Sequence, residues 1–542
     1  MTQLSVSLLA FTALSCLLPR HVGAVDVTVS LNYSTYIGTA QAETGVTQWL
    51  GIRYAEPPLG DLRFMPPQDP VVNTTTQLAD QHGKYCLATN DAADDTATSE
   101  DCLFLDVYAP SNATTSSNLP VYFFIQGGGF NTNSNPNLNG TGLVQASGNN
   151  IIVITMNYRV GLYGFLANGQ NLQGNYGLLD QRLALLWVQK YVKQFGGDPS
   201  HVVLGGDSAG AASISLHMTA YGGRDDGLFQ AAAGESVSFA VVLTSEESKY
   251  QYDNLALRLG CVGNSSQTLA CLQNKTSEEI QDVNYNIPYP GAAARPLYMY
   301  NPVIDGDLIR NLTYTSFANG DFIKVPVIFG DDTNGGTVFT PKNTSTLAES
   351  DMFLKNQLFN LTLEQFATIN DLYPNPNQTC PNEGCYWRQV SNAYGEARYM
   401  CPSLYLSNAF TEYGVAESWA YRWNVEDPDQ IAEGEGVPHT VEVNAIWGPY
   451  NTNGAAPSSY YPNGTNAHAV PVVQGYWTSF IRTYNPNTYR LNGSAEWVTW
   501  NSTAKGRLLF DTGGVTSMED LAGSDLMDRC DFWSDIGPDI LQ

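Results

Sequence analysis

The stretch His201-Val202-Val203-Leu204-Gly205-Gly206-Asp207-Ser208-Ala209-Gly210 joins a short apolar run to a glycine-rich turn, and an alanine-rich segment follows. Residues 206–210 fit the pattern G-x-S-x-G, in which a serine occupies a sharp, strained turn between a strand and a helix. The flanking glycines are needed because a Cβ there would collide with neighbouring backbone. Such a turn raises the hydroxyl above the sheet, next to the outward-pointing amides of a helix N-terminus. The stretch therefore predicts Ser208 as a nucleophile.

Outward from this turn, apolar β-rich runs alternate with helical patterns. Helical spacing over 178–195 places Leu179, Leu183 and Leu186 on one side, and Gly196-Gly197-Asp198-Pro199 ends it. Strands are expected at 119–126, 151–156, 201–204, 230–234 and 325–329. Continuous apolar strands separated by helices indicate a central, mostly parallel sheet with helices on both faces.

A serine nucleophile needs a base. Beyond the first 24 residues the chain has five histidines: His82, His201, His217, His439 and His468. His201 begins the strand before the turn and is expected to be structural, while His217 lies two turns into the following helix and would point away. His439 lies far downstream in a loop-like stretch, and serine first with histidine last is the chain order of α/β-hydrolases. We expect His439 to be the base.

Acyl transfer also needs hydrogen-bond donors for the oxyanion that forms at the carbonyl. The triplet Gly127-Gly128-Gly129 follows the strand expected at 119–126. We expect the amides of Gly128, Gly129 and Ala209 to form the oxyanion hole.

The ends and the surface of the chain suggest secretion. Residues 1–24 are expected to be a signal peptide, because the apolar run from Leu4 to Leu18 precedes the small-residue site Val22-Gly23-Ala24, and residues 25–542 are expected to form one domain. Thirteen Asn-x-Ser/Thr sequons suit an extracellular glycoprotein with N-linked glycans. No later run of about 18 apolar residues indicates a membrane span.

Composition restricts the partners. A formal charge of −27 argues against nucleic acid and against stable association with anionic membranes. Neither His/Cys metal-ligand spacing nor a phosphate-binding glycine loop is found, so no metal and no organic cofactor are expected. The expected partner is a small ester.

Several further motifs resemble the type-B carboxylesterase/lipase family, which includes cholinesterases and fungal esterases. They span nearly the whole chain: Gly51-Ile52-Arg53-Tyr54-Ala55-Glu56-Pro57-Pro58, Leu62-Arg63-Phe64, Ser99-Glu100-Asp101-Cys102-Leu103, Asn157-Tyr158-Arg159, Gly177-Leu178-Leu179-Asp180-Gln181 and Phe195-Gly196-Gly197-Asp198-Pro199. The resemblance implies the α/β-hydrolase fold, the oxyanion hole named above, and buried ion pairs Arg63–Glu100 and Arg159–Asp180. It also implies the disulfides Cys86–Cys102 and Cys261–Cys271, with Cys401–Cys530 plausible as a third and Cys380–Cys385 remaining; spacing alone leaves the pairing of the last four open.

One departure from the family concerns the acidic residue that orients the histidine. The family carries G-x-x-x-D-E-G-T after a strand, whereas this chain reads Gly330-Asp331-Asp332-Thr333-Asn334-Gly335-Gly336-Thr337, with Gly335 in place of the glutamate. Asp332 or Asp331 at the same strand end could replace it, as could Glu235 after an earlier strand, or the acid is missing and the enzyme is slow. We favour Asp332.

These patterns predict a secreted serine carboxylesterase acting through a Ser–His acyl-enzyme. The segment 87–101 is short and polar, whereas a lid that binds lipid surfaces is amphipathic. This segment therefore favours soluble, short-chain esters as substrates. Phe130, Phe239 and Trp447 are candidates for a substrate pocket, although core packing is the simpler interpretation of each. Two alternatives stay open: a weakly active or inactive binding protein on the same fold, and an acyltransferase or lactone-forming enzyme.

Overall fold

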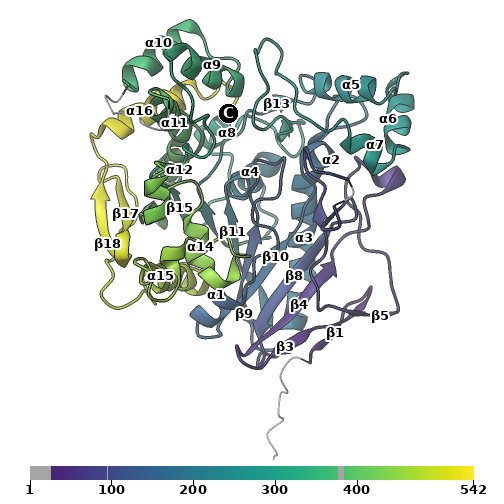
Figure 1. Ribbon diagram of the computed structural model, residues 1–542. Helices are drawn as coiled ribbons and strands as arrows, with labels where there is room; N and C mark the ends of the chain where they lie inside the picture. Colours follow the sequence, from purple (N-terminus) through teal and green to yellow (C-terminus); the bar gives the residue numbers. More distant parts are fainter. Residues whose placement is uncertain (1–25, 94, 376–383) are drawn as a thin grey trace, which may run out of the picture.

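The computed structural model describes residues 26–93, 95–375 and 384–542, and its centre is a large mixed sheet (Figure 1). The strand order is β18-β17-β16-β15-β12-β11-β9-β10-β8-β4-β3. All pairs from β10 to β17 are parallel, and the flanking pairs are antiparallel. The strands are β3 (Thr39–Gln41), β4 (Val46–Arg53), β8 (Phe104–Pro110), β9 (Leu119–Ile125), β10 (Ile152–Met156), β11 (Gly197–Asp207), β12 (Ala231–Glu235), β15 (Val327–Asp332), β16 (Ser418–Asn424), β17 (Gly506–Asp511) and β18 (Val515–Asp520).

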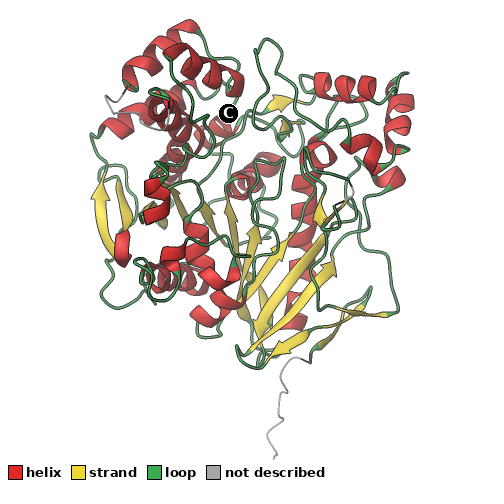
Figure 2. Cartoon of the chain, in the orientation of Figure 1, coloured by secondary structure: helices red, strands yellow, loops and turns green. Residues whose placement is uncertain are grey.

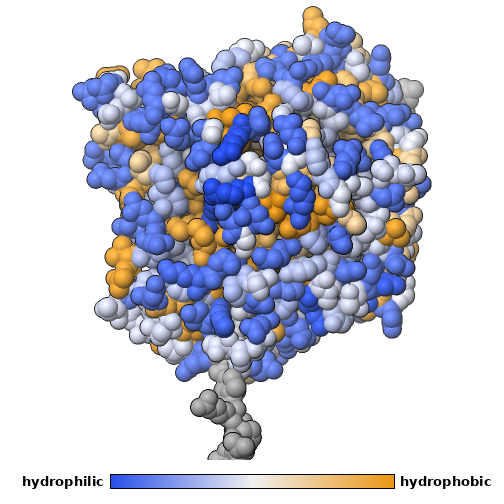
Figure 3. All heavy atoms as spheres, turned by 180° about the vertical axis from the view of Figure 1, so that it is seen from behind, coloured by the Kyte–Doolittle hydropathy of each residue, from blue (hydrophilic) through white to orange (hydrophobic). Residues whose placement is uncertain are grey.

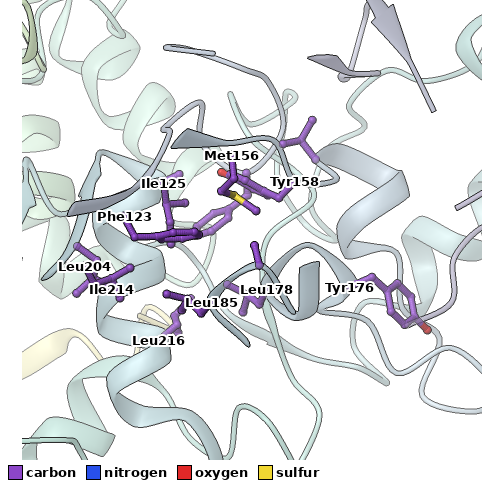
Figure 4. Packing of buried hydrophobic residues seen from close by; sticks show 14 of the residues in the cluster. Phe123, Ile125, Met156, Tyr158, Tyr176, Leu178, Leu185, Leu204, Ile214 and Leu216 are labelled. Atoms are coloured by element: carbon purple, nitrogen blue, oxygen red, sulfur yellow. The ribbon is translucent and has the colours of Figure 1, made fainter. Parts of the chain in front are cut away.

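Helices cover both faces of this sheet, because alternate strand residues supply two separate apolar layers (Figure 2). On one face Phe123, Ile125 and Leu204 pack with residues of α3 and α4, as Figure 4 shows. On the other face Tyr122 and Phe124 pack against α1, α14 and α15. These helices are α1 (Thr141–Ala146), α3 (Tyr176–Tyr191), α4 (Ala209–Gly223), α14 (Glu442–Trp447) and α15 (Ala469–Thr483).

Two further groups of helices lie in the upper part of the view in Figure 1, one at each side. The group at the right is α5 (Lys249–Arg258), α6 (Ser265–Gln273) and α7 (Ser277–Gln281). The group at the left is α9 (Leu347–Gln357), α10 (Leu363–Leu372), α11 (Trp387–Gly395), α12 (Cys401–Glu412) and α16 (Asp525–Ile536). Between α11 and α12 lies a π-helical turn, η3 (Glu396–Met400), and this left group has its own apolar cluster.

The expected fold class is confirmed. The strands predicted at 119–126, 151–156, 230–234 and 325–329 correspond to β9, β10, β12 and β15. The helix predicted at 178–195 corresponds to α3, which a 3-10 helix at Val192–Phe195 follows directly. The strand predicted at 201–204 is longer: β11 already begins at Gly197, which pairs with Leu119 before the register shifts ahead of Val202.

The pairs implied by the family resemblance are present. Arg63 binds Glu100 at 2.6 Å and Arg159 binds Asp180 at 2.7 Å, both as buried pairs. Disulfides join Cys86 to Cys102, Cys261 to Cys271 and Cys401 to Cys530. Cys380 and the expected signal peptide lie outside the described residues.

The face of the molecule opposite to the view of Figure 1 is predominantly hydrophilic. In Figure 3, which shows the molecule from behind, polar residues cover most of the face and hydrophobic residues are scattered among them. Across residues 26–93, 95–375 and 384–542, no helix is both long and apolar enough to cross a membrane.

Candidate active site

Ser208 occupies the turn between β11 and α4. Its backbone has φ 52° and ψ −116°, a conformation rare for a residue with a side chain. The neighbouring glycines permit it: a Cβ on Gly210 would lie 1.9 Å from the carbonyl oxygen of Ile125, and one on Gly206 would lie 2.6 Å from the carbonyl carbon of Gly210. The local sequence thus forms the strained strand–turn–helix unit that it predicts.

The glycine triplet after β9 lies against this serine. A Cβ on Gly127 would be 2.9 Å from the Cβ of Ser208, and the Gly127 amide donates to the Asp207 carboxylate at 2.8 Å. The amides of Gly128, Gly129 and Ala209, by contrast, donate no hydrogen bond to any described residue. Three backbone donors beside the serine are therefore available to a ligand, as an oxyanion hole requires.

Asp207 anchors the triplet from the turn itself. Its other carboxylate oxygen accepts from the Asn135 amide at 2.8 Å, and burial raises the pKa of Asp207 to about 7. The residue before the nucleophile therefore fixes the position of Gly127 and, through it, the two free amides that follow.

His439 lies in a pocket of aromatic rings. Its ring centroid is 4.0 Å from that of Tyr399 and 5.1 Å from that of Phe339. Both imidazole nitrogens are buried and have no hydrogen-bond partner among the described residues. Burial, and then the charge of Arg398, lower the pKa of His439 to about 3. The imidazole is therefore neutral at physiological pH, which is the form that can accept a proton.

Neighbouring strand ends connect the His439 loop to the serine turn. The Ser208 amide donates to the carbonyl of Glu235 at the end of β12, and the Ser236 hydroxyl donates to Asp332 at the end of β15. Asp332 in turn accepts from the Thr440 amide at 2.6 Å. Serine and histidine thus lie at the same, carboxyl edge of the sheet. No hydrogen bond between the Ser208 hydroxyl and the His439 ring is formed in the described chain; in unliganded enzymes such bonds are often long and tighten with substrate.

Asp332, the favoured acid, makes no hydrogen bond to His439. Its carboxylate is used by Thr440 and Ser236, and it lies beside the buried carboxyl of Glu442. Burial and the Glu442 charge raise the pKa of Asp332. The two carboxyls therefore share a proton more readily than both ionise.

The other two candidate acids are also directed elsewhere. Glu235 accepts from the Trp477 indole at 3.2 Å and from the Tyr122 hydroxyl at 3.3 Å, on the face of the sheet covered by α15. Asp331 is buried near Arg507 and Arg422, and burial raises its pKa to about 7. Neither carboxylate donates to or accepts from the histidine in the described chain.

Gly335, which replaces the family glutamate, faces the histidine. A Cβ built on it would lie 4.0 Å from Nδ1 of His439 and 3.7 Å from the Tyr399 ring. A longer side chain at this position would reach the imidazole. The missing carboxylate is thus a local change of side chain, and the backbone still brings residue 335 to the ring.

The remaining sequence candidates have structural roles. His217 bonds Gln181 at 2.9 Å and His201 bonds the carbonyl of Ile481 at 2.8 Å. Phe130, Phe239 and Trp447 are packed in the apolar layers of the core.

Sequence reasoning missed the side chains that surround the histidine. Tyr399 and Arg398 belong to η3, and Tyr298 lies against Gly129, with its ring carbon 2.5 Å from where a Cβ would stand. Helical periodicity gives no sign of a π-helical turn, so no signal in one sequence marked these residues.

Comparisons with known proteins agree with this geometry. Residues 26–533 match the model of the carboxylesterase family. Secreted lipase 4 of Gibberella zeae is 30% identical over 84% of this chain and 83% of its own, and secreted lipase 1 of Botryotinia fuckeliana is 29% identical over 90% and 89%. The crystal structure of Aspergillus niger EstA has a TM-score of 0.91 and 42% identity, and the match covers 95% of this chain and 99% of that one. The chain therefore belongs to the carboxylesterase family and is a carboxylic ester hydrolase.

Proposed function

We propose that the chain hydrolyses esters through an acyl-enzyme on Ser208, with His439 as general base and then general acid. The Ser208 oxygen attacks the ester carbonyl carbon while its proton moves to His439. The alcohol leaves with that proton. Water, deprotonated by the same imidazole, then attacks the acyl-enzyme and releases the acid.

The observation that carries this proposal is the set of free amides at Gly128, Gly129 and Ala209 beside a strained serine. Charge develops on the carbonyl oxygen during attack, and preorganised N–H groups stabilise it. Each such donor contributes about 3 kcal/mol to the transition state.

Hydrolysis of 4-nitrophenyl butyrate by matched variants tests the proposal. We expect Ser208→Ala and His439→Gln each to reduce kcat at least about a thousandfold, because the two residues act as one unit. A Ser407→Ala variant removes a buried hydroxyl that donates to the Ser403 carbonyl within α12, and it serves as the control. A Ser208→Ala enzyme with near wild-type turnover would refute the proposal.

Asp332 is proposed as a positioning residue that acts through the His439 loop. Its carboxylate accepts from the Thr440 amide, one residue beyond the histidine. An asparagine at 332 retains an acceptor oxygen, whereas an alanine does not. We expect Asp332→Ala to lower kcat with little change in KM, and Asp332→Asn to restore most of it. A hundredfold or larger loss in Asp332→Asn would instead make Asp332 the acid that orients the imidazole.

Soluble, short-chain esters are the proposed substrates. Among the described residues from Tyr85 to Cys102, the regular elements are the short strands β6 (Tyr85–Cys86) and β7 (Thr98–Ser99). The described residues that join these strands carry little apolar surface. The relatives named as secreted lipases make emulsified lipids the alternative. A panel of 4-nitrophenyl esters of rising chain length decides: we expect an optimum at short chains, and a sharp rise in activity above the solubility limit of long-chain esters would favour the lipase.

Secretion with N-linked glycans is proposed for the same chain. The sequon asparagines within the described residues are exposed, apart from the half-buried Asn139. Both curated fungal relatives are named as secreted. Treatment of the protein recovered from culture medium with a peptide N-glycosidase should lower its mass; an unchanged mass would refute glycosylation.

A further inference from the structure

Arg398 is a buried guanidinium without an acidic partner. It is 6% exposed, and its Nε and Nη2 are shielded from solvent and hydrogen-bond to no described residue. The other buried arginines of the described chain, Arg63, Arg159 and Arg507, each bind a carboxylate. Leaving a buried charge unpaired costs several kcal/mol, so this arrangement calls for a ligand or another compensation.

The two free nitrogens form the edge of the guanidinium that binds carboxylates elsewhere in this molecule. Arg63 uses Nε and Nη2 to hold the two oxygens of Glu100, at 2.7 and 2.6 Å. Arg159 uses the same two atoms to hold Asp180, at 2.8 and 2.7 Å. This planar fork matches a carboxylate in geometry as well as in charge.

The acidic residue closest to Arg398 in the chain is committed to other partners. Glu396, on the same turn η3, binds Arg529 through Nε and Nη2 at 2.7 and 2.8 Å, and it also accepts from the Tyr373 hydroxyl at 2.7 Å. Glu396 therefore does not neutralise Arg398. The residues whose pKa responds to the Arg398 charge are tyrosines and His439: Tyr289, Tyr298, Tyr394, Tyr399 and His439.

Arg398 is adjacent to the proposed reaction centre. The next residue along η3, Tyr399, lies on the His439 ring. Tyr298, which is also within reach of the Arg398 charge, packs against Gly129 of the oxyanion triplet. The Arg398 charge thus acts on the rings that contact His439 and Gly129. π-helical turns are often found at functional sites, and here one presents both Arg398 and Tyr399.

We propose that Arg398 binds a carboxylate of the substrate, so that the preferred esters are monoesters of dicarboxylic acids. This inference rests on the proposed function of Ser208 and His439. The ester carbonyl binds at the free amides, and the second, ionised carboxyl of the acyl chain accepts two hydrogen bonds from Nε and Nη2. The surrounding tyrosines keep water away from this ion pair, which strengthens it.

Matched substrate pairs test the inference. The mono-4-nitrophenyl esters of glutaric, adipic, pimelic and suberic acids are compared with 4-nitrophenyl esters of the neutral acids of equal carbon number, and the rate with Ser208→Ala is subtracted as background. We expect at least one dicarboxylic monoester to exceed its neutral counterpart in kcat/KM by about tenfold or more, the range for a charge-assisted pair. Equal or lower values across the whole series in the wild-type enzyme would overturn the inference.

Variants assign the preference to the guanidinium. Arg398→Met, of similar length and without charge, should lose the preference while the neutral esters are hydrolysed at the wild-type rate or faster, because the charge that opposes the His439 imidazolium is gone. Arg398→Lys, which has the charge without the fork, should retain a small part of it. A preference that survives in Arg398→Met would also overturn the inference. Hydrolysis of the neutral esters and its loss in Ser208→Ala report on the proposed function separately.

Discussion

At the scale of single residues, the unusual feature of this chain is that His439, the proposed base, is buried without a carboxylate partner among the described residues. The His439 nitrogens have no partner among the described residues, and Gly335 stands where a side chain would reach Nδ1. A neutral imidazole can accept the serine proton, yet no carboxylate among the described residues bonds to the imidazolium that forms. The adjacent guanidinium of Arg398 opposes it further. We therefore expect a slow enzyme, whose turnover is limited by the free energy needed to form the imidazolium of His439.

Replacement of Gly335 by glutamate should restore the missing charge. Residue 335 has room for a side chain, since a Cβ there meets only ordinary van der Waals contacts. We expect Gly335→Glu to raise kcat/KM for 4-nitrophenyl butyrate at least about tenfold, because a carboxylate stabilises the imidazolium. The change should also raise the pKa of His439 from about 3, and so move the acid limb of the pH–rate profile toward neutral pH.

A matched variant separates charge from bulk in that experiment. Gly335→Gln supplies a side chain of the same size without the charge, so it should show neither the rate gain nor the shifted acid limb. Equal kinetics for the two variants would show that His439 is not limited by a missing carboxylate.

At the scale of elements, the junction of β11 and α4 determines where the chemistry takes place. The junction is tight because α4 starts directly after Ser208 and passes close to the end of β9. Glycine at 210 is what allows this approach, since any side chain there would meet the Ile125 carbonyl. The position of Ser208, the proposed nucleophile, therefore depends on backbone contact between a helix and the neighbouring strand.

Gly210→Ala should disturb this junction. The added Cβ would lie 1.9 Å from a backbone oxygen, so helix and strand must separate. We expect the free energy of unfolding to fall by about 1–3 kcal/mol. We also expect most of the esterase activity to be lost. Gly506→Ala in β17 is the control, because its nearest contact is the flexible end of Met518 at 3.4 Å. Denaturant unfolding that shows Gly210→Ala as stable as Gly506→Ala would contradict this account.

The elements near Ser208 were predictable from sequence, and the surroundings of His439 were not. β9, β10, β12 and β15 are continuous apolar runs in the sequence and α3 shows helical spacing, and glycines follow β9 and α3. The contacts of Asp332 and Glu235 depend on which face of a strand meets which helix, and one sequence does not determine that. Arg398 lies on a π-helical turn that has no sequence signal, so the effect of its charge on His439 emerges only from the fold.

At the scale of the whole molecule, the active-site edge holds several buried carboxyls. Burial raises the pKa of Asp207 and Asp331 to about 7, and it also raises those of Asp332, Glu235 and Glu442. In the unfolded chain such groups lose their protons near pH 4. Between about pH 4 and 7 the folded protein therefore binds more protons than the unfolded chain, and stability falls as pH rises.

The thermal midpoint should accordingly be higher at pH 5 than at pH 8. Burial lowers the pKa values of His217 and His439 to about 3, so below about pH 6.5 these two residues make stability rise with pH. The buried carboxyls outnumber them, so the opposite dependence prevails. Asp331→Asn should flatten the dependence, because the Asp331 carboxyl has no hydrogen-bond partner among the described residues and the amide removes its titration. A midpoint that rises steadily from pH 5 to pH 8 in calorimetry would contradict the assignment of protons to these carboxyls.

The whole account depends on Ser208 acting as a nucleophile that His439 activates at the carboxyl edge of the sheet. Covalent labelling with a fluorophosphonate, followed by peptide mass spectrometry, measures this most directly. We predict one adduct per chain, on Ser208, which is absent in Ser208→Ala and forms far more slowly in His439→Gln. No adduct on the folded wild-type protein, or an adduct on a different serine, would contradict the account.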